Sequence, residues 1–96
     1  MATSTIPFQW PTIPAQLANG SDLNTIKTPG MYFWTNSVAN IPTNSPISGQ
    51  ATLIVMQASN AERVVQLVFG GTTNVQGAYF RIGMENNYWS NWKQMA

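Results

Sequence analysis

Residues 51–69 read ATLIVMQASNAERVVQLVF, and this stretch decides the fold. Two runs rich in β-branched residues, 51–58 and 63–69, flank a short polar segment that has the composition of a turn. Both faces of these two strands are apolar, whereas a sheet wetted on one side alternates between apolar and polar residues. Both faces therefore need a cover, either a second layer or neighbouring subunits. We expect subunits, because the chain has too few elements for two full sheets.

Further strand-like runs lie on both sides of this hairpin. Pro29-Gly30 is a turn signal, and an aromatic run follows it directly. We predict a mainly β fold, a small antiparallel meander that is sandwich-like and is completed by homotrimerisation. Strands are expected at 31–36, 51–58, 63–69, 78–84 and near 92–95, with loops at 36–50 and 70–78.

The N-terminal residues differ in character from the rest of the chain. Pro7, Pro11 and Pro14 fall within eight residues, which excludes a helix and favours an extended path. We therefore divide the chain into an extended, Pro-rich lead-in or linker segment, 1–21, and a β domain, 22–96. Asp22 is a candidate cap for a short turn at the start of the domain.

Composition excludes several classes of function. The chain has 96 residues with a net charge of +1, and only 7 % of them are charged. So few cations cannot neutralise a line of phosphates, so we expect no nucleic acid partner. No apolar run is long enough to span a bilayer, and we expect no membrane insertion. Cysteine and histidine are both missing, which removes the usual zinc ligands and histidine-based acid–base chemistry, and we expect no metal and no cofactor.

The sequence contains few residues that could carry out catalysis. A glycosidase needs two carboxylates a few ångströms apart, and Glu62 and Glu85 would fall near the same end of a hairpin with Arg63 between them. Two acids at a sheet end are more often a solvated rim. We therefore expect no enzymatic activity, and a polysaccharide depolymerase fragment stays as the alternative.

The C-terminal stretch 78–96, AYFRIGMENNYWSNWKQMA, is dense in aromatic and amide side chains. Aromatic stacking with convergent amides is the chemistry that neutral glycans need. At least one of Trp89 and Trp92 is expected to pack against Met31, Phe33 or Trp34 as core or subunit seam. The candidate glycan-binding residues lie in the turn at 85–91, which follows the predicted strand 78–84: Asn86, Asn87, Tyr88, Trp89 and Asn91.

Two polar residues within the predicted strands have structural explanations. Arg81 is expected to point away from Phe80 and Ile82, and a stacked guanidinium or an interface ion pair is favoured over a ligand clamp. Gln66, isolated among valines, is favoured as a hydrogen-bonding device that fixes strand register rather than as a ligand group.

Residues 22–96 resemble the pyocin knob family, small domains found near the tips of phage and R-type pyocin tail fibres. The resemblance rests on DLNTIKTPGMYFW at 22–34, the Asn40-x-Pro42 loop, GQATLIV, VVQLVF and AYFRIG followed by WSNW. The Asn40–Pro42 loop is longer than the family pattern, and residues 1–21 lie outside it. The chain also stops just after the tryptophan pair, so we expect the domain to be terminal in its fibre.

This resemblance implies a homotrimeric fibre module at, or next to, the receptor-contacting end. We expect the chain to be part of a virion tail fibre that acts extracellularly and binds a bacterial cell-surface glycan. A purely structural trimerisation or spacer domain is the second alternative, beside the depolymerase fragment.

Overall fold

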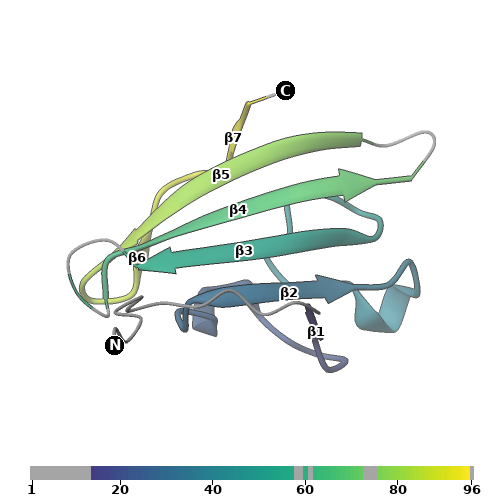
Figure 1. Ribbon diagram of the computed structural model, residues 1–96, viewed down its shortest axis with the longest axis horizontal. Helices are drawn as coiled ribbons and strands as arrows, with labels where there is room; N and C mark the ends of the chain where they lie inside the picture. Colours follow the sequence, from purple (N-terminus) through teal and green to yellow (C-terminus); the bar gives the residue numbers. More distant parts are fainter. Residues whose placement is uncertain (1–13, 58–59, 61, 73–75, 96) are drawn as a thin grey trace, which may run out of the picture.

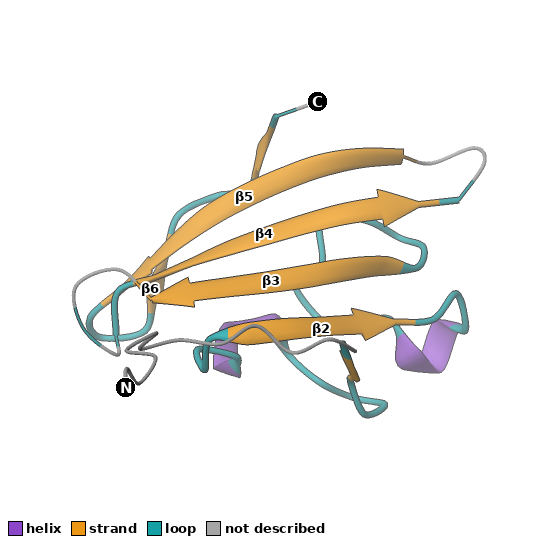
Figure 2. Ribbon diagram, viewed as in Figure 1, coloured by secondary structure: helices purple, strands orange, loops and turns teal. Residues whose placement is uncertain are grey.

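The computed structural model describes residues 14–57, 60, 62–72 and 76–95, and they build a mainly β domain around one sheet (Figures 1 and 2). The sheet order is β1-β2-β3-β4-β5-β6, and β7 pairs with β5 off this path. The four central strands β2 to β5 form the expected antiparallel meander, while β1 joins β2 in parallel. The bounds are Ala15–Gln16 for β1, Gly30–Trp34 for β2, Ala51–Gln57 for β3, Val64–Gly71 for β4, Gln76–Met84 for β5, Tyr88–Trp89 for β6 and Lys93–Gln94 for β7.

One face of the sheet, called the inner face here, carries every fully buried residue of the strands that the structure describes. Cross-strand pairs such as Leu53 with Val68 and Val55 with Gln66 fix which residues share it. The buried apolar side chains on it are those of Trp34, Ala51, Leu53, Val55, Val64 and Val68. The alternation of buried and half-buried residues along β3 and β4 is the strand period of two.

The second layer over the inner face consists of loops of the same chain, not of a second sheet. Leu17 and Leu23 from the β1–β2 connection and Ile47 from the β2–β3 connection are buried and join the core. Asp22 caps the 3₁₀ turn η1 (Leu23–Thr25), because its Oδ1 accepts a hydrogen bond from the Asn24 amide at 2.9 Å. The indole Nε1 of Trp34 donates to the Gly49 carbonyl at 2.8 Å, which fixes the end of the 36–50 loop.

Asn40 anchors that loop from the last position of the 3₁₀ turn η2 (Val38–Asn40). Its side chain is buried, accepts from the Thr35 amide at 2.6 Å and donates to the Leu17 carbonyl at 2.8 Å. A third contact, at 3.0 Å, joins Asn40 Nδ2 to Asn19 Oδ1. Asn40 thus connects the segment before β2 to the segment after it. Its hydrogen bonds hold this proline-containing loop in place without regular secondary structure.

The chain's own loops cover the inner face of the sheet. The expected burial of the other face by neighbouring subunits stays a prediction. Most of the predicted lead-in segment, 1–13, lies outside the described residues, but Ala15–Gln16 pairs with β2 and Leu17 is buried. The expected loop at 70–78 is shorter, because Gly70 and Gly71 belong to β4 and Gln76 begins β5.

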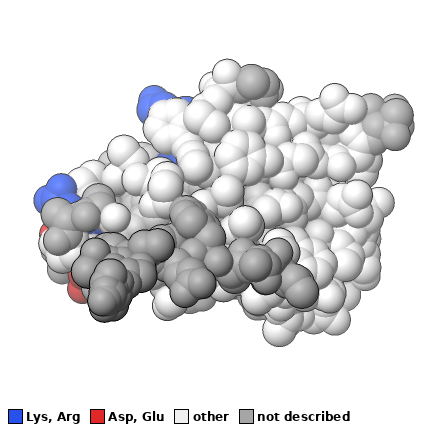
Figure 3. Space-filling model, viewed as in Figure 1, with Lys and Arg blue, Asp and Glu red and all other residues white. Residues whose placement is uncertain are grey.

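The opposite face, called the outer face here, remains apolar without being fully buried. Its central row pairs Met31 with Ile54, Ile54 with Leu67, and Leu67 with Phe80. In a neighbouring row, Met56 and Ile82 flank Val65 and are 37 % and 42 % exposed. On strands β2 to β5 the outer face comprises Met31, Phe33, Thr52, Ile54, Met56, Val65, Leu67, Phe69, Ala78, Phe80 and Ile82, and at its edge Lys93 of β7 pairs with Phe80. None of the outer-face residues on β2 to β5 is charged, and in Figure 3 the few charged atoms gather at the left and upper edges of the view.

Candidate functional site

The C-terminal turn joins β5 to β6 and carries the predicted glycan-binding residues. Met84 pairs with Tyr88 and Gly83 with Trp89, so Glu85, Asn86 and Asn87 form the connection. Asn86 and Asn87 have φ values of +63° and +57°. Asparagine tolerates this left-handed region better than most residues, so the turn itself accounts for both of them.

Trp89 lies on the inner face and not at the surface of the turn. Its ring packs over Gly83, where an added Cβ would come within 2.6 Å of the indole. The guanidinium carbon of Arg81 is 4.1 Å from the centroid of the same ring. The Lys27 ammonium lies 5.8 Å from this centroid. Because protein groups approach the ring closely, Trp89 is poorly placed to stack on a sugar.

Arg81 lies between two tryptophans. Its guanidinium carbon is 4.6 Å from the Trp92 centroid, so both Trp89 and Trp92 contact it within cation–π range. Trp92 is fixed in turn by its Nε1, which donates to the Asn44 carbonyl at 2.8 Å. The predicted stacking of Arg81 on an aromatic ring is confirmed. Trp89 and Trp92 pack against the buried core that includes Trp34, as expected, whereas Met31 and Phe33 lie on the outer face.

Gln66 completes this buried cluster. Arg81 Nε donates to Gln66 Oε1 at 2.9 Å, and Gln66 Nε2 donates to the carbonyls of Leu23 and Ile26 at 2.8 and 2.9 Å. The predicted hydrogen-bonding role of Gln66 is thus confirmed. Burial lowers the pKa of Arg81 to about 10, while the charge of Asp22 acts in the opposite direction. Arg81 therefore stays protonated at neutral pH and serves the fold.

The residues of the turn that remain open to a ligand are fewer than predicted. Tyr88 is 56 % exposed, and Asn86, Asn87 and Asn91 are exposed around it. Ser90 is engaged by the sheet, because its Oγ accepts from the Ile82 amide at 2.9 Å. A phenol ring with three neighbouring amides can offer a sugar one stacking face and several hydrogen-bonding groups.

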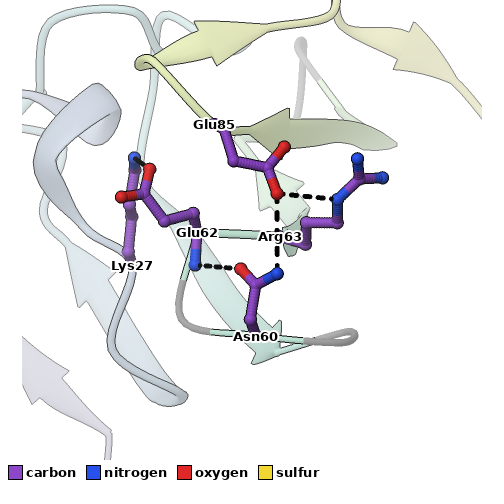
Figure 4. Close-up of polar contacts among 5 residues, drawn as sticks. All are labelled: Lys27, Asn60, Glu62, Arg63 and Glu85. Atoms are coloured by element: carbon purple, nitrogen blue, oxygen red, sulfur yellow. Dashed lines mark hydrogen bonds and ion pairs between the residues drawn. The ribbon is translucent and has the colours of Figure 1, made fainter.

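The two carboxylates considered for catalysis are both engaged by cations at this end of the sheet (Figure 4). Glu85 Oε2 lies 3.1 Å from Arg63 Nε, and Glu62 Oε1 lies 3.9 Å from Lys27 Nζ. Asn60 connects them, because its Nδ2 lies 3.5 Å from Glu85 Oε2 and its Oδ1 accepts from the Glu62 amide at 2.8 Å. The hydrogen bond from Arg63 lowers the pKa of Glu85, which is the wrong direction for a general acid at neutral pH.

This contact predicts a small pH dependence of stability. A carboxylate whose pKa is lowered in the folded state contributes stability above its ordinary pKa of 4.5, and this stability is lost as the pH falls through the folded value. The melting temperature of Glu85→Gln should therefore fall less between pH 7 and pH 3 than that of the wild type. The matched control is Glu62→Gln, which removes a carboxylate and leaves the Arg63–Glu85 contact in place. Equal acid sensitivity of Glu85→Gln and the wild type would contradict the assignment.

A second feature lies at the opposite end of the sheet, beside the loops predicted at 36–50 and 70–78, which the sequence left open as alternative places for binding. A hollow of about 630 Å³ is lined by Gln50, Gly70, Gly71, Thr72, Gln76 and Gly77. A neighbouring hollow of about 330 Å³ shares Gln50, Gly70 and Gly71 and extends to Phe33, Thr52 and Phe69. The three glycines were the available signal, and the sequence prediction placed them in a polar loop.

Comparisons with protein-family models, curated proteins and solved structures found no match for this chain. Across the residues described, no helix has the length and apolar character that crossing a membrane requires. Within the same residues, no group of three or more His, Cys, Asp or Glu side chains could hold a metal ion.

Proposed function

We propose that this chain is a knob module at the tip of a phage or phage-like tail fibre, working as a homotrimer in attachment to glycans on the host surface. The observation that carries the proposal is the outer face, a continuous apolar surface on a chain in which only 7 % of the residues are charged. Large exposed apolar patches on soluble domains mark interaction sites. The resemblance of residues 22–96 to pyocin knob domains supports a trimer as the assembly.

The trimer interface is proposed at the centre of the outer face. Ile54, Leu67 and Phe80 lie side by side on three neighbouring strands and are only half-buried in one chain. Burial of apolar area contributes about 25 cal/mol per Å², so a face of this kind is a favourable surface for association. The inner face is not available for such an interface, because the loops of the chain already cover it.

The glycan contact is proposed at the exposed side of the C-terminal turn. Tyr88 supplies the stacking ring, with Asn86, Asn87 and Asn91 as amide partners, and Trp89 supports the turn from beneath. One such contact is weak, and three copies on one fibre strengthen attachment through avidity. The function needs no catalysis, cofactor or metal, and it is exerted outside the cell at the host surface.

The test is a binding measurement on an array of bacterial surface polysaccharides with the wild type and Tyr88→Ala. We expect apparent binding to weaken by roughly tenfold or more, because the loss of about 1.4 kcal/mol per site already amounts to a factor of ten. Tyr88→Phe keeps the ring and should retain most of the binding. Val38→Ala, at a position that is 88 % exposed on η2, is the remote control.

Two outcomes would contradict this assignment. If Tyr88→Ala binds as well as the wild type, the turn is not the contact. If a trimeric wild type binds no polysaccharide, the alternative of a structural spacer is favoured. Release of oligosaccharide by the wild type would instead favour the depolymerase alternative.

A further inference from the structure

The hollow at the far end of the sheet owes its shape to glycine. Gly70 pairs with both Ala51 and Gly77, and Gly71 pairs with Gln76, so two neighbouring strands lack side chains at the same level. Gly70 and Gly71 have φ values of +128° and +121°, which side-chain-bearing residues rarely adopt. A Cβ at Gly77 would approach the Tyr79 ring to 2.7 Å. The backbone angles and the packing therefore require these glycines. Because they carry no side chains, the backbone is left uncovered between the flanking side chains and forms the floor of the hollow.

The groups around this floor are amides, hydroxyls and aromatic rings. Gln50 and Gln76 are exposed on either side of Gly71, and Thr72 adds a hydroxyl. On the adjoining part of the outer face, Phe33 and Phe69 flank Thr52 in register, and both rings are half-buried. Amides and hydroxyls both donate and accept hydrogen bonds, as sugar hydroxyls do, and aromatic faces take the apolar side of a sugar ring.

Charge distinguishes this end of the sheet from the other. Residues 28–61 and 64–80 contain no Asp, Glu, Lys or Arg, and all the lining residues of both hollows beyond Pro14 fall within these ranges. The ion pairs of Glu62 and Glu85 lie at the opposite end, beside the C-terminal turn. A charged ligand would find no counter-charge in the hollow, whereas a neutral ligand has no buried charge to desolvate.

We propose that the glycine-floored hollow is a second carbohydrate-binding site. It takes a neutral sugar residue whose hydroxyls bond Gln50 and whose apolar side meets Phe69 at the edge of the outer face. The inference rests on the proposed function for its ligand class, a neutral surface glycan, but its position rests on the hollow alone.

The experiment is an NMR titration of the full ¹⁵N-labelled chain with galactose, glucose, rhamnose and N-acetylglucosamine as free sugars at millimolar concentrations. At least one sugar should cause saturable shifts of the Gln50 side-chain amide and of the backbone amides of Gly70, Gly71 and Gly77. Gln50→Ala and Phe69→Leu should each weaken this response by about tenfold, the factor that corresponds to one lost contact of ordinary strength. Phe69→Leu keeps an apolar side chain, so a folded variant is expected.

Gln57→Ala is the matched control, since Gln57 is also an exposed glutamine and lies at the other end of β3. Its titration should follow the wild type. Saturable shifts confined to Asn86, Asn87, Tyr88 and Asn91 would overturn the second site and leave the proposed function standing. If none of the four sugars produces saturable shifts anywhere, the second site is overturned and the proposed glycan contact fails with it.

Discussion

Replacing Arg81 by leucine should lower the free energy of unfolding by about 2–4 kcal/mol, because the change leaves a buried hydrogen-bond acceptor without its donor. Gln66 Oε1 accepts from Arg81 Nε at 2.9 Å, and Gln66 is 0 % exposed. The same change removes a cation held between two indole rings, a contact that is worth about 2 kcal/mol when it is desolvated. Part of this loss is offset, because leucine removes the cost of burying a charge. The measurement is urea unfolding followed by tryptophan fluorescence.

The matched control for this prediction is Arg63→Leu. Arg63 also contacts a partner at 3.1 Å, but its side chain is 47 % exposed, and surface ion pairs contribute at most about 1 kcal/mol. Arg81→Lys is the informative intermediate, because it keeps the positive charge but not the planar group that stacks on both rings. We expect it to lie between leucine and the wild type. If Arg81→Leu costs no more than Arg63→Leu, the cluster does not stabilise the C-terminal strands as argued.

The strands could be predicted because the strand propensity of their residues and the turn segments between them indicate the same structure. The β-branched residues of 51–57 and 64–68 favour extended backbone, and the short polar segment between them leaves a hairpin as the natural connection. The sequence could not tell which face the chain itself would cover, since Leu53 and Ile54 are equally apolar. That choice depends on loops such as the one held by Asn40, whose contacts with Leu17 and Asn19 span more than twenty residues.

The short parallel strand was missed for a physical reason as well. Ala15–Gln16 has two residues, both exposed, and neither favours extended structure strongly. It is a strand only because β2 offers an edge, and the Leu17 amide then donates to the Phe33 carbonyl at 2.9 Å. Tertiary pairing of this kind leaves no local signal in the sequence.

The candidate site was predictable in composition but not in orientation. Tyr88 and Trp89 are neighbours in β6, so their side chains point to opposite faces of the sheet, and only one of them can lie on the inner face. Gly83 decides the matter, because its missing side chain makes room for the indole of its cross-strand partner. The hollow near Gly71 was hidden for the converse reason: glycines at 70, 71 and 77 are typical of a loop, and only strand pairing brings them to one level of the sheet.

Replacing Leu67 by lysine should convert the proposed trimer into monomers. Leu67 lies between Ile54 and Phe80 at the middle of the outer face. An unpaired charge buried in an interface costs about 3–5 kcal/mol, and a symmetric trimer would contain three of them. Light scattering after size exclusion should give three chains of 10.6 kDa for the wild type and one for the variant. The isolated chain should tolerate the change, because Leu67 is only half-buried and a lysine stem can extend its ammonium group into water.

The control for this prediction is Val38→Lys, which adds the same charge at a position that is 88 % exposed and lies on η2, outside the strands of the sheet. It should stay trimeric. A monomeric wild type at micromolar concentration would remove the trimer from the proposed function, whereas a trimeric Leu67→Lys would move the interface away from the outer face. The two results differ in consequence, because only the second keeps three copies of each glycan site on one fibre and hence the avidity on which attachment depends.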